Sequence, residues 1–243
     1  MRFIGNEFME KTRFQYLGRS DQSRNLPQPS LELKYDASRP IFDLPEPDKI
    51  KVRSLDLRQA IEGRRSIREY SQEPLTIEEL SYLLWVTQGV IQVTPGATFR
   101  NVPSAGARHA LETYLLINNV RDVPDGIYRF LAIEHKLVEM NTDPDIADRV
   151  VEGCLGQDFV KKSAVTFIWT ADTYRMKWRY GERGYRYLHL DAGHACQNLY
   201  LSAGSIDCGV CAIAAFLDEY MNDLLELDGV EQITLYIATV GKI

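Results

Sequence analysis

Long apolar runs and cysteines are both scarce in this 243-residue chain. No uninterrupted apolar stretch approaches the roughly 18 residues that a membrane-spanning helix needs, so we expect none. The opening residues, MRFIGNEFMEKTRFQY, carry charges throughout and lack the apolar centre of a secretion signal. Cys154, Cys196, Cys208 and Cys211 do not suggest a secreted disulfide framework. These absences lead us to expect a cytoplasmic protein.

Positive charge is also in deficit. The chain has 28 Lys and Arg residues against 34 Asp and Glu residues, which gives a net charge of -6. A nucleic-acid-binding surface would need a basic stripe, and this composition argues against one. A local basic cluster would therefore serve a small anion, and we expect no nucleic-acid partner.

Several signatures of known chemistry are missing. The sequence has neither a Gly-x-Gly-x-x-Gly nor a Walker A pattern, and neither a Gly-x-Ser-x-Gly elbow nor a zinc-protease motif. Cys208-x-x-Cys211 has no second pair beside it and no thioredoxin-type setting. We expect no metal site, and any phosphate-bearing cofactor would be held outside Rossmann or P-loop geometry.

Residues 1–50 show little periodic pattern and are interrupted by prolines. The five prolines of this segment are Pro27, Pro29, Pro40, Pro45 and Pro47. An unpatterned stretch of this length usually wraps over a folded surface. We predict an extended N-terminal arm over residues 1–50, lying on the protein itself or on a partner subunit, and a folded domain over residues 51–243.

Helical signals recur along the predicted domain. Thr76 and Glu79 match a capping box, in which each side chain bonds the other residue's backbone N–H. An apolar face follows at helical spacing: Ile77, Leu80, Leu83 and Leu84. The other expected helices are 54–63 with Ser54 as N-cap, one with Pro144 at its first helical position, 191–204 and 217–227.

Short apolar runs rich in β-branched and aromatic residues predict strands. They lie at 111–119, 164–172 and 232–240, and two more fall within 126–140 around a turn at Glu134-His135. Helices and strands mix without a steady βαβ alternation. This order favours an α+β fold over a doubly wound parallel sheet.

The segment GRRSIREY concentrates positive charge in an acidic protein. Arg64, Arg65 and Arg68 fall within five residues, with the hydroxyl of Ser66 between them. Guanidinium groups offer forked donors suited to a phosphate or a carbonyl edge. The alternative is a solvated turn in which the arginines pair with neighbouring glutamates.

Three later features are further candidates. Pro103-Ser104-Ala105-Gly106 is a small-residue turn that would let a flat ligand approach the backbone, and Arg108 adds a cation. Residues 191–204 form a helix rich in Ala, Gly and Ser that carries the polar His194, Gln197 and Asn198. Lys242 follows the last strand and could reach a phosphate. Each also has a structural interpretation: a plain loop, core polar groups bonded to backbone, and a solvated lysine.

In this order the features resemble the nitroreductase family of flavin enzymes, and the resemblance runs from about Ser54 to Lys242. PSAGARHALETYLLI followed by DGIYRFLAIEHKL is most similar to the SagB-type branch, which includes dehydrogenases that oxidise azoline rings in peptides. The resemblance implies a nitroreductase-type α+β fold with a central, mainly antiparallel sheet flanked by helices. It also implies bound FMN and a homodimer with two flavin sites shared between the subunits.

The resemblance also implies site residues. Arg64, Arg65, Ser66 and Arg68 would hold the FMN phosphate, ribityl chain and ring edge, and Lys242 would join them at the phosphate. Pro103, Ser104, Ala105 and Gly106, with Arg108 beside them, would come from the other subunit and line the isoalloxazine. The backbone near Ile213, Ala214 and Ala215 would face the reactive ring nitrogen.

The function implied is FMN-dependent oxidoreduction, with hydride passing through flavin N5 in a ping-pong cycle and NAD(P)H as a candidate donor. The alternatives are azoline oxidation on a peptide, flavin fragmentation, and a non-catalytic flavin-binding partner subunit. SagB-type dehydrogenases often carry Lys-Tyr where this chain has Arg179-Tyr180. Because arginine is almost never deprotonated, Tyr180 is the candidate acid or base, within a segment, 174–187, that could face the substrate.

Overall fold

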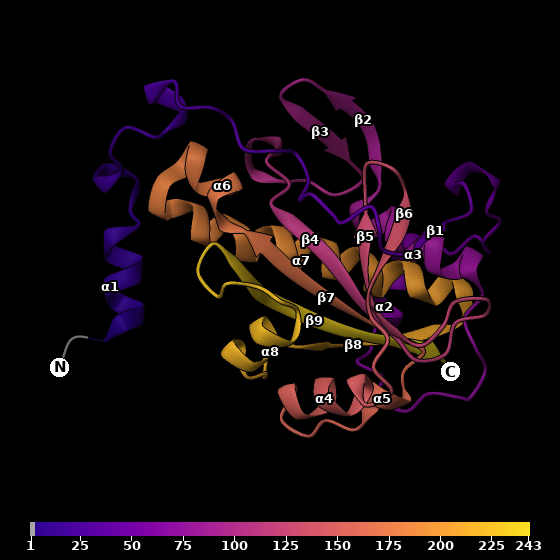
Figure 1. The fold of residues 1–243 in the computed structure, drawn as a ribbon. Coiled ribbons are helices and arrows are strands. Elements are labelled where there is room, and N and C mark those ends of the chain that lie inside the picture. The colour runs from indigo at the N-terminus through magenta and orange to yellow at the C-terminus, as the bar shows by residue number, and fades with distance from the viewer. Residues whose placement is uncertain (1–2) are drawn as a thin grey trace.

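A seven-stranded sheet forms the centre of the protein, in a computed structural model that describes residues 3–243 (Figure 1). Its order is β1-β6-β5-β4-β7-β9-β8, and every neighbouring pair is antiparallel. The strands are β1 Ile41–Asp43, β4 Leu111–Ile117, β5 Gly126–Leu131, β6 Lys136–Asn141, β7 Val165–Asp172, β8 Cys208–Ile213 and β9 Gln232–Lys242. The predicted α+β fold with an antiparallel sheet is confirmed.

Helices cover both faces of this sheet (Figure 1). On one face lie α3 (Ile77–Gln88) and α7 (Gly184–Ala203); on the other lie α4 (Ile146–Gly153), α5 (Phe159–Lys162) and α8 (Asp218–Leu224). Because both faces are covered, β4 is buried along its whole length. Its sequence therefore reads as a continuous apolar run instead of an alternation.

The helix starts follow their capping residues. The capping box of Thr76 and Glu79 is present at α3 as predicted. The prediction of Ser54 as N-cap was wrong: α2 (Leu57–Gly63) begins after Asp56, whose carboxylate accepts a hydrogen bond from the Gln59 amide. The prediction for Pro144 was also wrong, because it lies in the turn before α4.

Other elements differ from the prediction. α7 begins at Gly184 instead of residue 191, because its polar, aromatic first turns continue the helix without an apolar signal. The sequence did not predict β1, β8 or the hairpin of β2 (Val90–Thr94) and β3 (Ala97–Arg100). The segment 174–187 proved to be α6 (Thr173–Tyr180), the turn Gly181–Arg183 and the start of α7, with Met176 and Trp178 buried.

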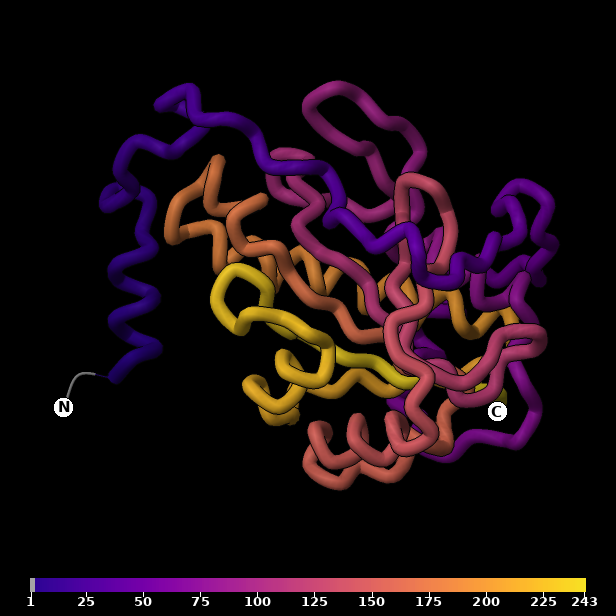
Figure 2. The backbone as a smooth tube through the Cα atoms, viewed as in Figure 1, coloured from indigo at the N-terminus to yellow at the C-terminus, as the bar shows by residue number. Residues whose placement is uncertain are grey.

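The N-terminal segment contains more structure than an arm. It has α1 (Ile4–Lys11) and the short 3₁₀ turns Phe14–Tyr16, Gln22–Arg24 and Pro47–Lys49. Between the second and third turns the chain runs extended across the domain, where the backbone carbonyl of Leu26 accepts from the Trp178 indole (3.1 Å). In Figure 2 α1 stands away from the sheet. The first two residues of the predicted arm lie outside the described part of the chain.

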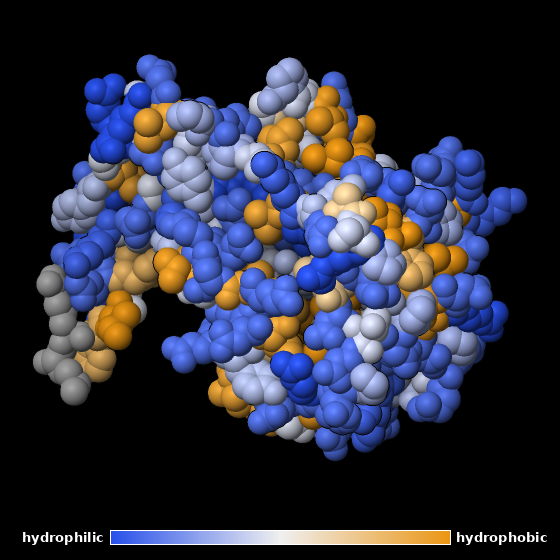
Figure 3. Space-filling model, viewed as in Figure 1, coloured by the Kyte–Doolittle hydropathy of each residue, from blue (hydrophilic) through white to orange (hydrophobic). Residues whose placement is uncertain are grey.

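The surface carries apolar side chains in a few projecting places. Ile91, Val93 and Phe99 are exposed on the β2–β3 hairpin, which Figure 3 shows as an apolar projection. Within residues 3–243, no helix has both the length and the apolar character required to cross a bilayer.

Candidate functional site

The segment around Ser66 runs along the free edge of the sheet. β8 is the last strand, with β9 on its inner side. On its outer side Ser66 and Val210 form a parallel bridge, and the Ile67 amide donates to the Val210 carbonyl (2.9 Å). The segment leaves α2 at Gly63 and turns extended at Arg64. The sheet edge thereby fixes the backbone of the predicted anion-binding residues.

Tyr200 of α7 joins this segment to the strand. Its hydroxyl lies 3.1 Å from the Ser66 hydroxyl and accepts a hydrogen bond from the Ala212 amide (2.8 Å). The guanidinium of Arg64 stacks over the Tyr200 ring, 5.1 Å from its centroid. One side chain therefore positions both the arginine and the serine, and sequence reasoning did not identify it.

Within the described part of the chain, the three arginines have no carboxylate partner. Among the described residues, no ion pair involves Arg64, Arg65 or Arg68. Glu62, the expected partner in a solvated turn, pairs instead with Arg58 (2.8 Å). Arg65 and Arg68 are exposed and Arg64 is half-buried. Uncompensated cations beside an exposed hydroxyl are a suitable donor set for an anion such as a phosphate monoester.

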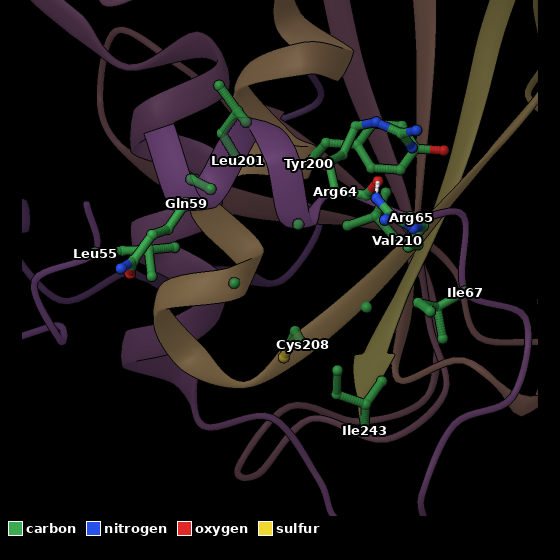
Figure 4. A pocket seen from close by; sticks show the side chains of 14 residues that line it. Leu55, Gln59, Arg64, Arg65, Ile67, Tyr200, Leu201, Cys208, Val210 and Ile243 are labelled. Atoms are coloured by element: carbon green, nitrogen blue, oxygen red, sulfur yellow. Dashed lines mark hydrogen bonds between the residues drawn. The ribbon is translucent and has the colours of Figure 1, made fainter. Parts of the chain in front are cut away.

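A cavity of about 280 Å³ opens beside this segment, between α2, α7 and β8 (Figure 4). Leu55, Leu201 and Ile243 contribute apolar lining, and Arg64 and Arg65 supply the charged part. A ligand with an anionic end and an apolar body matches this division of the lining.

The far end of β8 carries the residues expected to face the ring nitrogen. Ile213 ends the strand and is buried, whereas Ala214 and Ala215 are exposed. From Val210 to Ala214 the chain advances roughly 13 Å at the rise of an extended strand. The Arg68 side chain extends towards this end of β8. Its guanidinium lies 5.8 Å from the ring centroid of Phe159, and Phe159 packs in the same apolar cluster as Ile213.

The Pro-Ser turn lies near the other end of α7. Ser104 donates to the carboxylate of Asp191 (2.5 Å), and its oxygen accepts from the His109 amide (2.9 Å). Gly106 packs against Tyr180 so closely that an added Cβ would lie 2.5 Å from the tyrosine oxygen. The turn and Tyr180, the candidate acid or base, are therefore direct neighbours.

A network of buried charged side chains holds the Pro-Ser turn in place. Arg175, 1% exposed, pairs with Glu112 (2.8 Å) and donates to the carbonyl of His109 (3.0 Å). Glu112 also accepts from the Leu33 amide of the N-terminal segment (3.0 Å). Desolvation, with Arg100 and other nearby cations, lowers the pKa of His109 to about 3, so its imidazole is neutral. No local signal in the sequence pointed to this network.

Lys242 and Asn198 serve the protein's own backbone. The ammonium of Lys242 is bound to Glu79, the capping-box residue of α3, and to the Ile206 carbonyl (2.7 Å). Its role at a phosphate beside the Arg64–Arg68 segment stays a prediction. Asn198 donates to the Val86 carbonyl of α3 (2.9 Å).

The predicted residues thus form two groups. Arg64, Arg65 and Ser66 meet near Tyr200, and Pro103–Arg108 meets near Asp191. Asp191 and Tyr200 are nine positions apart on α7, which corresponds to roughly 13 Å along the helix axis. The first group suits an anion such as a phosphate monoester, but one chain does not bring the second group to the same place.

The cysteines and acidic residues do not suggest a metal centre. Cys208 and Cys211 are three apart on a strand, so their side chains leave opposite faces of β8. Over residues 3–243, no group of three or more His, Cys, Asp or Glu residues could hold a metal ion.

Comparison with known proteins identifies relatives. The model of the nitroreductase family matches residues 61–242. MJ1384 of Methanocaldococcus jannaschii, named as a nitroreductase, is 34% identical over 83% of this chain and 96% of its own length. The trifolitoxin operon protein TfxC of Rhizobium leguminosarum bv. trifolii is 26% identical over 74% of this chain and 53% of its own length. A nitroreductase-type structure from Anabaena variabilis superposes with a TM-score of 0.65 at 30% identity, over 77% of this chain and 38% of that one.

Proposed function

The chain belongs to the nitroreductase family, and from this we propose that it is an FMN-dependent oxidoreductase working by a ping-pong cycle. The observation that carries the proposal is the group formed by Arg64, Ser66 and Tyr200 at the edge of β8. There, cations without carboxylate partners flank a hydroxyl beside an open cavity. When bound, FMN would accept hydride from NAD(P)H or another donor and pass it to a second substrate.

The residues of the first group would hold the cofactor by its charged end. A phosphate monoester carries a charge of about -1.5 to -2 at neutral pH, and Arg64, Arg65 and Ser66 would donate to it. Arg68, farther along the strand, would lie near the pyrimidine edge and stabilise the anionic reduced ring. The exposed backbone at Ala214 and Ala215 would border the ring itself.

The two groups along α7 support a homodimer with shared sites. Antiparallel pairing of two α7 helices would bring the Pro-Ser turn of one subunit to the Arg64 group of its partner. α7 presents an exposed stripe at helical spacing: His189, Leu190, Gly193, His194 and Gln197. An added Cβ at Gly193 would meet no heavy atom within 4 Å, and Leu190 is 59% exposed, so this stripe could pack against another copy.

The absorption spectrum of the purified protein tests the cofactor and the activity. We expect a yellow protein with one FMN per chain whose visible band bleaches with NADH or NADPH under anaerobic conditions. A colourless protein that FMN does not reconstitute would rule the proposal out. A yellow protein inert to both nicotinamides and to azoline substrates would instead indicate the non-catalytic partner subunit.

Light scattering tests the shared site. The wild-type chain should be a dimer, and Gly193→Arg should give monomers that lose FMN. Val230→Asp, which adds a charge at another exposed position, should remain a dimer with bound flavin. Monomers that retain full flavin would contradict the shared-site arrangement.

Azoline oxidation on a peptide is the second candidate. Similarity to a protein of the trifolitoxin operon favours it, and Tyr180 lies against the Pro-Ser turn, where a substrate proton could be exchanged. Oxidation of a thiazoline-containing peptide, with a mass loss of two hydrogens, is the test. If Tyr180→Phe removed azoline oxidation but not bleaching by nicotinamides, the tyrosine would be the acid or base of that reaction.

A further inference from the structure

The Pro-Ser turn holds an unfavourable backbone conformation. Gly106, Ala107 and His109 all have positive φ angles, of 59°, 51° and 42°. Glycine adopts this region freely, but alanine and histidine do so only with steric strain. A loop with two such residues keeps its shape only where surrounding groups hold it. The contacts that hold the turn in this conformation therefore contribute to its function.

Asp191 holds the first half of the turn. Its side chain projects from α7, and the residue is only 5% exposed. One carboxylate oxygen accepts from the Ser104 hydroxyl (2.5 Å), and the other faces the Ala105 amide (3.4 Å). The Ser104 oxygen in turn accepts from the His109 amide across the loop (2.9 Å). A single carboxylate therefore closes the turn from both sides.

The second half of the turn has a separate support. Arg175 donates to the His109 carbonyl and is itself paired with Glu112. Arg108 donates to the Gly106 carbonyl and to the Gly96 carbonyl of the β2–β3 turn. The Arg108 backbone amide donates to the Ala105 carbonyl (3.2 Å), but within the described chain neither guanidinium group hydrogen-bonds Ser104 or Ala105. Asp191 is thus the charged side chain that fixes the position of the Ser104–Ala105 backbone.

We propose that Asp191 is a positioning residue, which holds the Ser104–Ala107 backbone at the flavin and so sets the geometry of hydride transfer. This inference rests on the proposed function, because the turn reaches a flavin only in the shared site. Asp191 itself would not touch the flavin or the substrate. Displacements of about 1 Å in groups that position a reacting centre can lower rates by two orders of magnitude.

A graded series of variants tests the role. Asp191→Asn keeps the shape and one acceptor but sets an amide donor near the Ala105 amide; Asp191→Ala removes both acceptors. We expect kcat to fall roughly tenfold and roughly a hundredfold, respectively. FMN content should stay within about twofold, because the dimer and the Arg64 group at the phosphate are both kept. Ser104→Thr, which retains the hydroxyl, should keep most of the activity that Ser104→Ala loses.

Ser81→Ala controls for a merely structural effect. The buried Ser81 hydroxyl on α3 donates to the Pro45 carbonyl and hydrogen-bonds His135, and neither partner belongs to the Pro-Ser turn. Its loss should therefore lower stability without lowering kcat. Hydrogen exchange at the Ala105 and His109 amides supplies a readout without flavin. Both should exchange faster in Asp191→Ala and at wild-type rates in Ser81→Ala.

The outcomes separate the inference from the proposed function. Unchanged kcat in Asp191→Ala, or a loss no greater than that of an equally destabilised Ser81→Ala protein, would overturn the positioning role. If the wild-type protein held no FMN, the proposed function would fail. The exchange rates would still decide whether Asp191 holds the turn, and unchanged exchange would overturn the inference on its own.

Discussion

The hydroxyl of Tyr200 lies 3.1 Å from that of Ser66, although 134 positions separate the two residues in the chain. The same oxygen accepts from the Ala212 amide of β8. One hydroxyl therefore links α7, the Arg64–Arg68 segment and the edge strand. The anion-binding group depends on the packing of α7 as well as on its own arginines.

Removing this hydroxyl should weaken the group without removing any charge. Tyr200→Phe keeps the ring beneath Arg64 but leaves Ser66 and Ala212 without their partner. We expect a loss of about 1 kcal/mol in the free energy of unfolding and roughly tenfold weaker FMN binding. Tyr220→Phe, which removes an exposed hydroxyl bonded to Glu152, is the matched control and should leave FMN affinity unchanged. Equal affinities for both variants would contradict the role of Tyr200.

Arg64 should contribute most of the charge-assisted binding. Charged hydrogen bonds contribute about 1.5–3 kcal/mol, so Arg64→Ala should weaken FMN binding by roughly ten- to a hundredfold. Arg58→Ala removes the same charge from the exposed side of α2, where Arg58 pairs with Glu62, and should have little effect. Fluorescence quenching of FMN on titration with apoprotein measures both. A similar loss in the two variants would mean that net charge, and not the site, is responsible.

Local signals in the sequence predicted the local structure. Thr76 and Glu79 are three residues apart, and a capping box needs no distant partner. The runs that form β4 and β7 were recognisable because both sheet faces are covered. β8 was missed because its sequence, CGVCAI, is short and rich in small residues, and its strand conformation comes from pairing with β9.

The site was predictable as a set of residue types but not as an arrangement. GRRSIREY and the Pro-Ser turn stood out by composition, whereas Tyr200 and Asp191 looked like ordinary helix residues. Their roles come from partners 134 and 87 positions away, which only the packing of α7 brings together. Lys242 was expected at a phosphate, and the sequence offered no sign that its ammonium would be bound to Glu79.

A methyl group at Gly106 should disturb the turn in two ways. The backbone has a positive φ of 59°, and an added Cβ would lie 2.5 Å from the Tyr180 oxygen. Gly156→Ala is the control, because Gly156 also has a positive φ, of 75°, but open space around it. We expect each variant to lose about 1 kcal/mol from backbone strain, with a further loss only at Gly106. Equal midpoints in urea denaturation would show that packing against Tyr180 is unimportant.

Lys242 should behave as a structural residue. It is bound to Glu79 and to the Ile206 carbonyl, so Lys242→Met leaves both acceptors without their donor. We expect a loss of about 1–3 kcal/mol in unfolding free energy and a clear coupling energy with Glu79→Gln in a double-mutant cycle. FMN affinity should stay within about twofold. A tenfold loss of affinity with unchanged stability would instead place the ammonium at the phosphate.

His109 should make stability depend on pH on the acid side of neutrality. Burial and nearby arginines lower its pKa to about 3 in the folded protein, against about 6.5 for an unperturbed histidine. Between these values the unfolded chain binds a proton that the folded protein does not. The stability that the neutral His109 contributes should therefore be fully present above pH 6.5. It should decrease as the pH falls towards 3, by up to about 1.4 kcal/mol per pH unit.

Replacing the imidazole isolates this contribution from those of other titrating groups. His109→Asn suits the positive φ of 42° at this position, because asparagine tolerates the left-handed region. Urea denaturation of both proteins from pH 4 to 8 should show a shallower decrease in the variant. The half-buried His135, whose pKa is also lowered by desolvation, is present in both and cancels in the comparison. Parallel pH profiles would mean that His109 is protonated in the folded protein or reaches solvent, and that the arginines around it do not hold it neutral.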